Sequence, residues 1–228
     1  MQHLVLLHGA IGAKDQLESL AEWLKDKYIV HTLNFSGHGG SAFHEGKFSI
    51  PFFATEVTDY LHRFNIQRAN IFGYSMGGYV AMYLAKNNPE KVDKIITLAT
   101  KFYWDEAIAE KEVKMLDPEK INEKIPVFAR QLEQRHHPND WKRVLGKTKE
   151  MLLQLGARNE LQIHDYTAIQ NQCLLLLGDK DKMITLDETL AVYNGLPNAE
   201  YKILPATPHP IEQVDTRLLS EMIQEFIN

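Results

Sequence analysis

Short apolar runs recur along the chain, and most of the segments between them carry apolar residues at helical spacing. A strand buried on both faces of a parallel sheet is continuously apolar, so each such run predicts a strand. The predicted strands are Leu4–Leu7, Tyr28–Phe35, Asn70–Phe72, Ile95–Ala99, Cys173–Leu177 and Ala199–Leu204. Their spacing leaves room for a helix between most neighbours, which indicates an α/β fold.

Helices are predicted between these strands from the apolar period and from capping residues. Ser49 caps a helix that has Pro51 in its first turn, and Thr185 with Glu188 has the spacing of a capping box. The predicted helices are Asp15–Lys25, a helix from Ser49 to Phe64, one from Ser75 to Asn87, one from Thr185, and Asp215–Ile227. A strand, a helix and a second strand form a right-handed βαβ unit by default, so the sheet is expected to be mostly parallel.

The alternation of strand and helix lapses between residues 102 and 169. Three helical segments are predicted there, over Asp105–Leu116, Pro118–Gln134 and Asp140–Leu155. A long excursion between two core strands is usually a lid or a binding insertion. We therefore expect one domain over residues 1–228, with a helical lid insertion over residues 102–169.

Composition narrows the class of protein. The 228 residues are 44% hydrophobic and 24% charged, which is ordinary for a globular protein. The net charge of -5 is scattered and gives no basic stripe, so nucleic acid is not an expected partner. No apolar run is long enough to cross a bilayer, and the first residues do not read as a signal peptide, so we expect a cytoplasmic protein without membrane contact. Cys173, the single cysteine, is expected to pack in a strand.

Candidate chemistry begins at Gly73-Tyr74-Ser75-Met76-Gly77, between a predicted strand and a predicted helix. A G-x-S-x-G turn holds its serine in a strained conformation, and glycine is needed where a Cβ would collide with the neighbouring strand or helix. A serine exposed at such a turn is a nucleophile that needs a base.

Two later loops offer the base and an acid. Asp179 and Asp181 follow the strand that ends at Gly178, and His209 lies between the last strand and the last helix. The carboxyl ends of parallel strands meet at one edge of the sheet, where ligands of open α/β folds bind. Ser75, one of the two aspartates and His209 therefore form a candidate catalytic triad.

These residues resemble the α/β-hydrolase superfamily over nearly the whole chain. The resemblance rests on His8-Gly9, Gly37-His38-Gly39, the Ser75 turn, Gly178-x-x-Asp181 and the loop of His209. It implies a mostly parallel sheet of about six strands, because the hairpin that often precedes the His-Gly strand is missing. It also favours Asp181 over Asp179 as the acid, and it implies an oxyanion hole made by the backbone N–H groups of Ala10 and Met76.

The sequence departs from the family pattern at two positions. Asn34 stands where many members have aspartate, at a position that is structural. Pro208 replaces the glycine that usually precedes the catalytic histidine, and Pro210 follows His209. Two prolines stiffen this loop. The departure leaves open to which subtype of the family the chain belongs.

Other polar and aromatic residues have a structural interpretation and a functional one. His8 and His38 each precede a glycine in a tight turn and are expected to shape loops or to line a pocket, and not to act as bases. His136 and His137 are adjacent, so they point apart on a helix; we expect solvated surface and no metal site. The aromatic candidates for substrate contact are Tyr74, Tyr103, Trp104 and Trp141, of which the last three, with Phe102, could equally pack the insertion on the sheet. Arg130, Arg135, Arg143 and Arg158 are expected to form mostly a solvated face, although one could meet an acidic substrate.

The sequence thus predicts a serine hydrolase that acts on a carboxylic ester of a small, fairly apolar acid, with no metal or organic cofactor. Two alternatives stay open. The resemblance also covers carbon–carbon bond hydrolases and lyases of menaquinone biosynthesis, which act on acidic substrates, and non-enzymatic ligand sensors. A small-molecule substrate is the only partner expected, and the sequence does not indicate an oligomeric state.

Overall fold

The computed structural model describes all 228 residues and contains one six-stranded sheet. The strands are β1 (Gln2–Leu7), β2 (Tyr28–Thr32), β3 (Ala69–Tyr74), β4 (Val92–Leu98), β5 (Gln172–Gly178) and β6 (Ala199–Leu204). Every neighbouring pair is parallel, in the order β2-β1-β3-β4-β5-β6. The predicted α/β architecture with about six parallel strands is confirmed.

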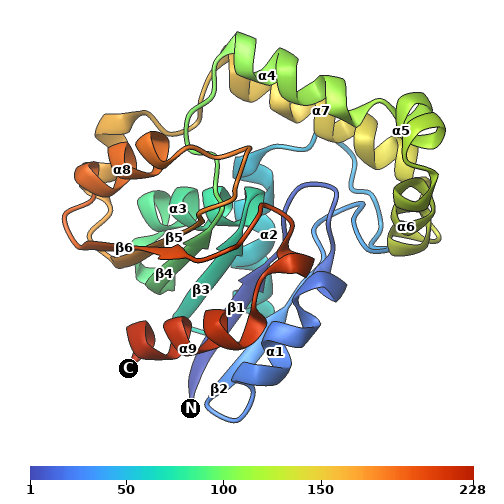
Figure 1. Ribbon diagram of the computed structural model, residues 1–228. Coiled ribbons are helices and arrows are strands. Elements are labelled where there is room, and N and C mark those ends of the chain that lie inside the picture. The colour runs from blue at the N-terminus through green and yellow to red at the C-terminus, as the bar shows by residue number, and fades with distance from the viewer.

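Helices cover both faces of the sheet, as Figure 1 shows. The α-helices are α1 (Glu18–Leu24), α2 (Ile50–Arg63), α3 (Met76–Asn87), α4 (Glu106–Val113), α5 (Pro118–Lys124), α6 (Pro126–His136), α7 (Trp141–Ala157), α8 (Leu186–Gly195) and α9 (Thr216–Ile227). Helices α1 and α9 pack together on one face, and α2 and α3 pack together on the other. No helix is both long and apolar enough to cross a membrane.

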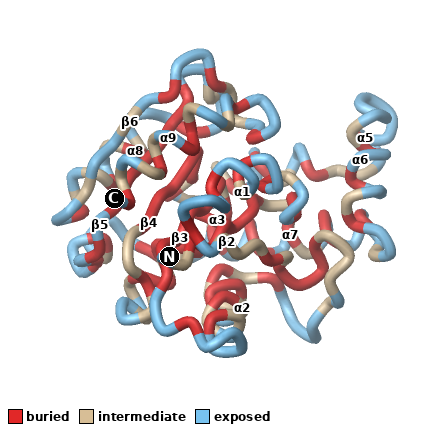
Figure 2. Tube along the Cα trace, turned by 90° about the horizontal axis from the view of Figure 1, so that it is seen from below, coloured by how far each residue is buried: buried red, intermediate tan, exposed pale blue.

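The strands divide the core between these two faces. In β1, Leu4 and Leu6 pack toward α1 and α9, whereas Val5 and Leu7 pack toward α2 and α3. Successive side chains of a strand point to opposite faces, so a strand that is covered on both sides must be apolar at every position. Figure 2 shows the buried part of the trace following the strands and α3, with exposed residues on the outer helices.

The chain between β4 and β5 forms α4 to α7, which we call the interstrand helices. In Figure 1, α4 and α7 lie side by side above the carboxyl ends of the strands, and α5 and α6 extend from them to one side. The predicted helix over Pro118–Gln134 is in fact two helices. Pro126 has no N–H to donate and disfavours helical backbone at Ile125, whose φ and ψ are -139° and 60°, so α5 ends and α6 begins there.

Helix caps agree with the sequence at both predicted positions. The Ser49 side chain accepts a hydrogen bond from Phe52 N–H, and the Thr185 side chain accepts one from Glu188 N–H. The Glu188 carboxylate, however, does not complete the capping box. It accepts from Phe102 N–H at 2.6 Å and Tyr103 N–H at 2.9 Å, and so ties α8 to the start of the interstrand segment.

Candidate active site

Ser75 lies in the turn between β3 and α3, at the centre of the sheet edge. Its φ of 51° and ψ of -117° are strained for a residue with a side chain. The backbone is held there by two contacts with the end of β4: Ser75 N–H donates to Leu98 O at 2.8 Å, and Thr100 Oγ1 donates to Ser75 O at 3.1 Å. The strain is therefore maintained by the sheet, and it lifts the Ser75 side chain to the cavity wall.

Glycine is required on both sides of this serine. A Cβ on Gly73 would lie 2.3 Å from Gly77 O, and a Cβ on Gly77 would lie 2.5 Å from Leu7 O. Both obstacles are backbone atoms that cannot move aside. The turn thus explains the spacing of the G-x-S-x-G pattern.

His209, in the loop after β6, is hydrogen-bonded to Asp181 in the loop after β5. The distance from His209 Nδ1 to Asp181 Oδ2 is 2.8 Å, and the Asp181 side chain is only 1% exposed. The other carboxylate oxygen accepts from Met183 N–H and Ile184 N–H. Burial by itself raises the pKa of Asp181, but the hydrogen bonds from His209 and the two N–H groups outweigh it, so the pKa is lowered. Asp181 is therefore a stable anion beside His209.

Asp179 makes a different contact. Its Oδ1 accepts a hydrogen bond from Thr207 N–H at 3.1 Å, which braces the loop that carries His209. Of the two aspartates considered from the sequence, Asp181 is hydrogen-bonded to the His209 side chain, whereas Asp179 is hydrogen-bonded to the backbone of the loop that carries His209.

Tyr74 also positions His209. Its hydroxyl donates to His209 O at 3.1 Å, and the two rings are 5.7 Å apart. Burial raises the pKa of Tyr74 well above its usual value, so its hydroxyl remains a donor. Tyr74 lines the cavity as predicted for a substrate contact, but its polar atom serves the loop of His209.

Ser75 and His209 line the same cavity, together with Ala10 and Met76. No hydrogen bond joins Ser75 to His209, an arrangement that is common before substrate binds. Met76 is the first residue of α3, so its N–H has no acceptor within the helix, and the Ala10 N–H donates to no protein group. Two residues whose backbone N–H groups have no protein acceptor thus line the cavity together with the serine.

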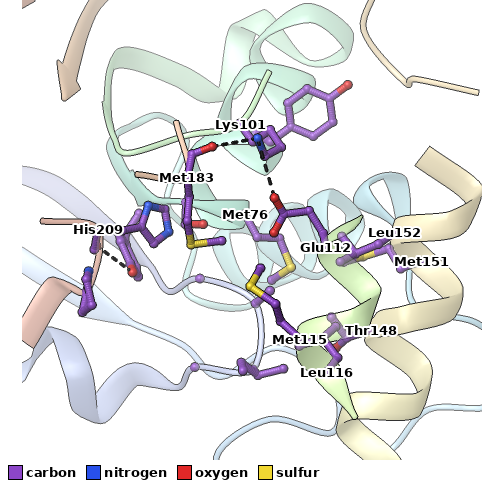
Figure 3. A pocket seen from close by; sticks show the side chains of 18 of the residues that line it. Met76, Lys101, Glu112, Met115, Leu116, Thr148, Met151, Leu152, Met183 and His209 are labelled. Carbon is purple, nitrogen blue, oxygen red and sulfur yellow. Dashed lines mark hydrogen bonds and ion pairs between the residues drawn. The ribbon is translucent and has the colours of Figure 1, made fainter. Parts of the chain in front are cut away.

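The cavity has a volume of about 300 Å³ and lies between the strand ends and the interstrand helices. The apolar residues that line it on the side away from His209 are Met76, Met115, Leu116, Met151 and Leu152, as Figure 3 shows. Methionine is flexible and polarisable, and it adapts to apolar groups of varied shape. This region, which also includes Tyr79, Trp104 and Leu155, is called the apolar lobe below.

Two cations and two anions also line the cavity. Lys101 Nζ lies 4.0 Å from a Glu112 carboxylate oxygen, with Glu112 itself 7% exposed. Arg135, on α6, lies 3.1 Å from Glu212 and 3.3 Å from Asp15. Each cation is therefore balanced by nearby carboxylates.

The other three aromatic residues predicted to contact substrate lie in three different places. Trp104 lines the cavity, whereas Trp141 is 7% exposed and packs in the core on the α2 and α3 face. Tyr103 is 57% exposed and lines a second cavity outside the first. Neither Tyr103 nor Trp141 reaches the cavity of Ser75, because the segment after β4 turns Tyr103 outward and α7 buries Trp141 at its first residue.

The prediction of a solvated surface at His136 is wrong. His136 is fully buried; its Nε2 donates to Ile11 O at 3.0 Å and its Nδ1 accepts from Gly39 N–H at 3.1 Å. His8 and His38 are also fully buried, with ring centroids 5.1 Å apart, and His38 lies 5.7 Å from His136. These three residues shape the loops after β1 and β2, as expected for His8 and His38, and dock α6 on them.

Burial sets the charge of these three rings. It lowers the pKa of His8 and of His136 to about 4, and lowers that of His38 well below its usual value. All three are neutral near pH 7. No group of three or more histidine, cysteine or acidic side chains is arranged to hold a metal ion.

Residues 2–137 match the sequence family described as the alpha/beta hydrolase fold. The chain is an α/β hydrolase. The match spans β1, the Ser75 turn and the first interstrand helices, and the sheet order agrees with it.

Named relatives of this α/β hydrolase are esterases and lipases. A Haemophilus influenzae protein whose name places it among the esterases and lipases is 23% identical over 99% of this chain and 83% of its own length. The pimeloyl-[acyl-carrier protein] methyl ester esterase of Aeromonas salmonicida is 34% identical, over 42% of this chain and 37% of its own length. The crystal structure of carboxylesterase CesB from Bacillus subtilis has a TM-score of 0.82 at 16% identity, covering 99% of this chain and 83% of that one. The hydrolase is thus similar to enzymes that act on esters.

Of the charged residues of the cavity wall, Arg135 was a candidate from the sequence, whereas Lys101, Glu112 and Glu212 were missed. The sequence contained a signal for Glu112. With Ala109 and Leu116 it lies on the buried stripe of α4 and the turn that follows, where a carboxylate is unusual. Lys101 had none, because a lysine directly after a strand is common on protein surfaces.

Proposed function

We propose that this hydrolase cleaves carboxylic esters with a small, fairly apolar acyl group through an acyl-enzyme formed on Ser75. The observation that carries the proposal is the 2.8 Å contact by which Asp181 orients His209, a residue that lines the same cavity as Ser75. A base that is oriented by a buried carboxylate and faces a serine on a strained turn is the arrangement that activates a hydroxyl group.

The chemical steps follow from this arrangement. Ser75 Oγ attacks the ester carbonyl while His209 Nε2 takes its proton, and Asp181 stabilises the charged ring. The carbonyl oxygen becomes negative and is met by the N–H groups of Ala10 and Met76. His209 then returns the proton to the departing alcohol, and a water molecule activated by His209 releases the acid from Ser75.

The cavity supports the choice of acyl group. Its volume of about 300 Å³ is at the small end of ligand sites, and its apolar lobe offers few hydrogen-bond partners. The soft methionine side chains suit a hydrocarbon chain better than a sugar or a phosphate.

Acidic substrates of carbon–carbon hydrolases or lyases are the second candidate, favoured by one observation. Arg135 and Lys101 line the cavity, and a free cation there would bind a substrate carboxylate. Arg135, however, is engaged by Asp15 and Glu212, and Lys101 lies between Glu112 and Glu188. The balance of charge therefore supports a neutral ester.

The test is turnover of p-nitrophenyl esters of increasing acyl length by the wild type, Ser75→Ala and His209→Ala. We expect the wild type to hydrolyse short esters and each substitution to lower kcat by at least about 10³-fold. Ser19→Ala and His62→Ala change exposed residues of the same types and are expected to retain full activity.

Absence of turnover on every ester, from protein with a cooperative thermal transition, would refute the esterase proposal. Turnover of a carboxylate-bearing carbon–carbon substrate would then support the second candidate. Saturable binding of small apolar acids without any turnover would support a ligand sensor.

A further inference from the structure

A second cavity shares a wall with the cavity of Ser75. The second has a volume of about 530 Å³ and lies between α4, α8 and the segment that precedes β5. Three residues line both cavities: Lys101, Glu112 and Met183. The exposed Tyr103 and Ile163 on the far side show that the second cavity opens toward the surface.

Lys101 is held firmly within this wall. Its Nζ donates to Met183 O at 2.9 Å and lies 4.0 Å from carboxylate oxygens of both Glu112 and Glu188. Its side chain is 12% exposed, and Figure 3 shows it linked to Met183 and Glu112 above the cavity. Because Glu188 is itself fixed by the N–H groups of Phe102 and Tyr103, the lysine stem has little freedom to swing aside.

The position of His209 shows which part of a substrate approaches this wall. The departing alcohol must lie beside His209 to receive its proton, so the acyl chain extends to the other side of Ser75. Core residues near His209, such as Tyr74 and Ile211, belong to the α1 and α9 face. The apolar lobe belongs to the opposite face, with Met76 and Leu155.

Tyr79 connects the apolar lobe with the second cavity. Its ring lines the lobe, and its hydroxyl accepts a hydrogen bond from Leu161 N–H at 2.9 Å and contacts Asn159. Leu161 and Asn159 line the second cavity. The space beyond Lys101 is thus a continuation of the acyl lobe that the wall closes off.

We infer that Lys101 is a specificity-determining residue whose side chain closes the acyl lobe and sets the longest straight acyl chain that the enzyme accepts. The inference rests on the proposed ester hydrolysis. Each methylene that enters the lobe raises kcat/KM by roughly fourfold through burial of apolar surface. A chain that reaches Lys101 gains no more, because the length of the Lys101 side chain fills the opening between the lobe and the second cavity.

The experiment compares acyl-length profiles of the wild type, Lys101→Ala and Lys101→Met on p-nitrophenyl esters. Lys101→Ala opens the wall, so we expect the optimum to move to longer chains by two or more carbons, with a gain of at least about tenfold on the longer esters. Lys101→Met removes the charge but keeps most of the length of the side chain. It is expected to retain the wild-type limit.

Ala191→Trp tests the path of the longer chain. Ala191 is exposed on α8 and lines only the second cavity. Alone, the substitution is expected to leave the profile unchanged, and in the Lys101→Ala background it is expected to abolish the gain on long esters.

Three results would overturn the inference: an unchanged limit in Lys101→Ala, the same shift in Lys101→Met, or a gain that Ala191→Trp does not reverse. Thermal melting reports folding, and if Lys101→Ala does not fold, Lys101→Ala/Glu112→Ala removes the lysine together with one of its two carboxylate partners and is judged in the same way. An unchanged limit with Ser75-dependent turnover intact refutes this inference alone. Loss of all ester turnover in the wild type refutes the proposed function as well.

Discussion

The loops at the strand ends and the interstrand helices that cover them are held in place by different forces. Backbone bonds to the sheet fix the loops: Ser75 N–H donates to Leu98 O, and Asp179 N–H donates to Leu204 O. The helices dock through side chains, and in the turn between α6 and α7 the Asn139 Nδ2 donates to Gly37 O at 3.0 Å and Ser41 O at 2.6 Å. Changes to the reacting groups that the loops carry should therefore abolish the reaction, whereas changes in the helices should alter stability and the choice of substrate.

The largest expected effect is on kcat, and it should differ between the two aspartates of the loop after β5. Asp181→Asn is expected to lower kcat on a short ester by about 10³- to 10⁴-fold, because an amide cannot stabilise the charged ring of His209 and favours the wrong tautomer. Asp179→Asn keeps an acceptor for Thr207 N–H, so a loss of less than about tenfold is expected. Steady-state kinetics on purified variants decide, and equal losses would contradict the assignment of the acid.

The next largest effect is on the free energy of unfolding, and it concerns His136. His136→Ala removes a buried ring and leaves Gly39 N–H and Ile11 O without their partner, at a cost of about 3 kcal/mol in the free energy of unfolding. His137→Ala, at the exposed neighbour, is expected to cost less than about 0.5 kcal/mol. Urea titration at pH 7 measures both, and similar values for the two variants would show that α6 does not depend on this contact.

The burial of His136 should also make the free energy of unfolding depend on pH. The pKa of His136 is about 4 in the folded protein, against roughly 6.5 in the unfolded chain, so below pH 6.5 the unfolded state binds a proton that the folded state refuses. The stability is intact above pH 6.5 and falls as the pH drops toward 4. His8 and His38 act in the same direction.

Replacing one of these rings should reduce that pH dependence. In His136→Gln the difference in unfolding free energy between pH 7 and pH 5 is expected to be about 2 kcal/mol smaller than in the wild type. His62→Gln, on the exposed face of α2, is the matched control and should leave the difference unchanged. A His136→Gln curve parallel to that of the wild type would show that His136 already carries a proton in the folded state at pH 5.

The two regions also differ in how far the sequence predicts them. Strand ends follow from apolar runs, and a strained turn between Gly73 and Gly77 leaves a signature in residue type, so Ser75 and the aspartates could be located in advance. The break at Pro126 was also present in the sequence as a signal, because proline disfavours helical backbone at the residue before it, but the single helix predicted over Pro118–Gln134 ignored it. The burial of His136 could not be predicted. An amphipathic pattern identifies which face of a helix is covered, but it does not distinguish a face that packs from one that lines a cavity, which is why Trp104 and Trp141 looked alike.

The smallest expected effect concerns Arg135 and the nature of the substrate. Burial raises the pKa of Glu212, but hydrogen bonds from Gln16 and Arg135 bring it below its usual value, so Arg135 faces an established anion. Because the ion pair is partly exposed, Arg135→Gln is expected to raise KM for a neutral ester less than about fivefold and to leave kcat unchanged. Arg130→Gln, exposed on the same helix, should have no effect.

The same variants, assayed on an ester that carries a free carboxylate, show whether Arg135 binds substrate. If Arg135 only docks α6 on the strand-end loops, Arg135→Gln changes kcat/KM for the acidic and the neutral ester by the same small factor. If Arg135 instead binds the carboxylate, kcat/KM for the acidic ester alone falls by about 10²-fold, since a charge-assisted bidentate contact is lost. That outcome would show that the interstrand helices take part in substrate recognition through Arg135. It would also favour the acidic substrates of the second candidate function.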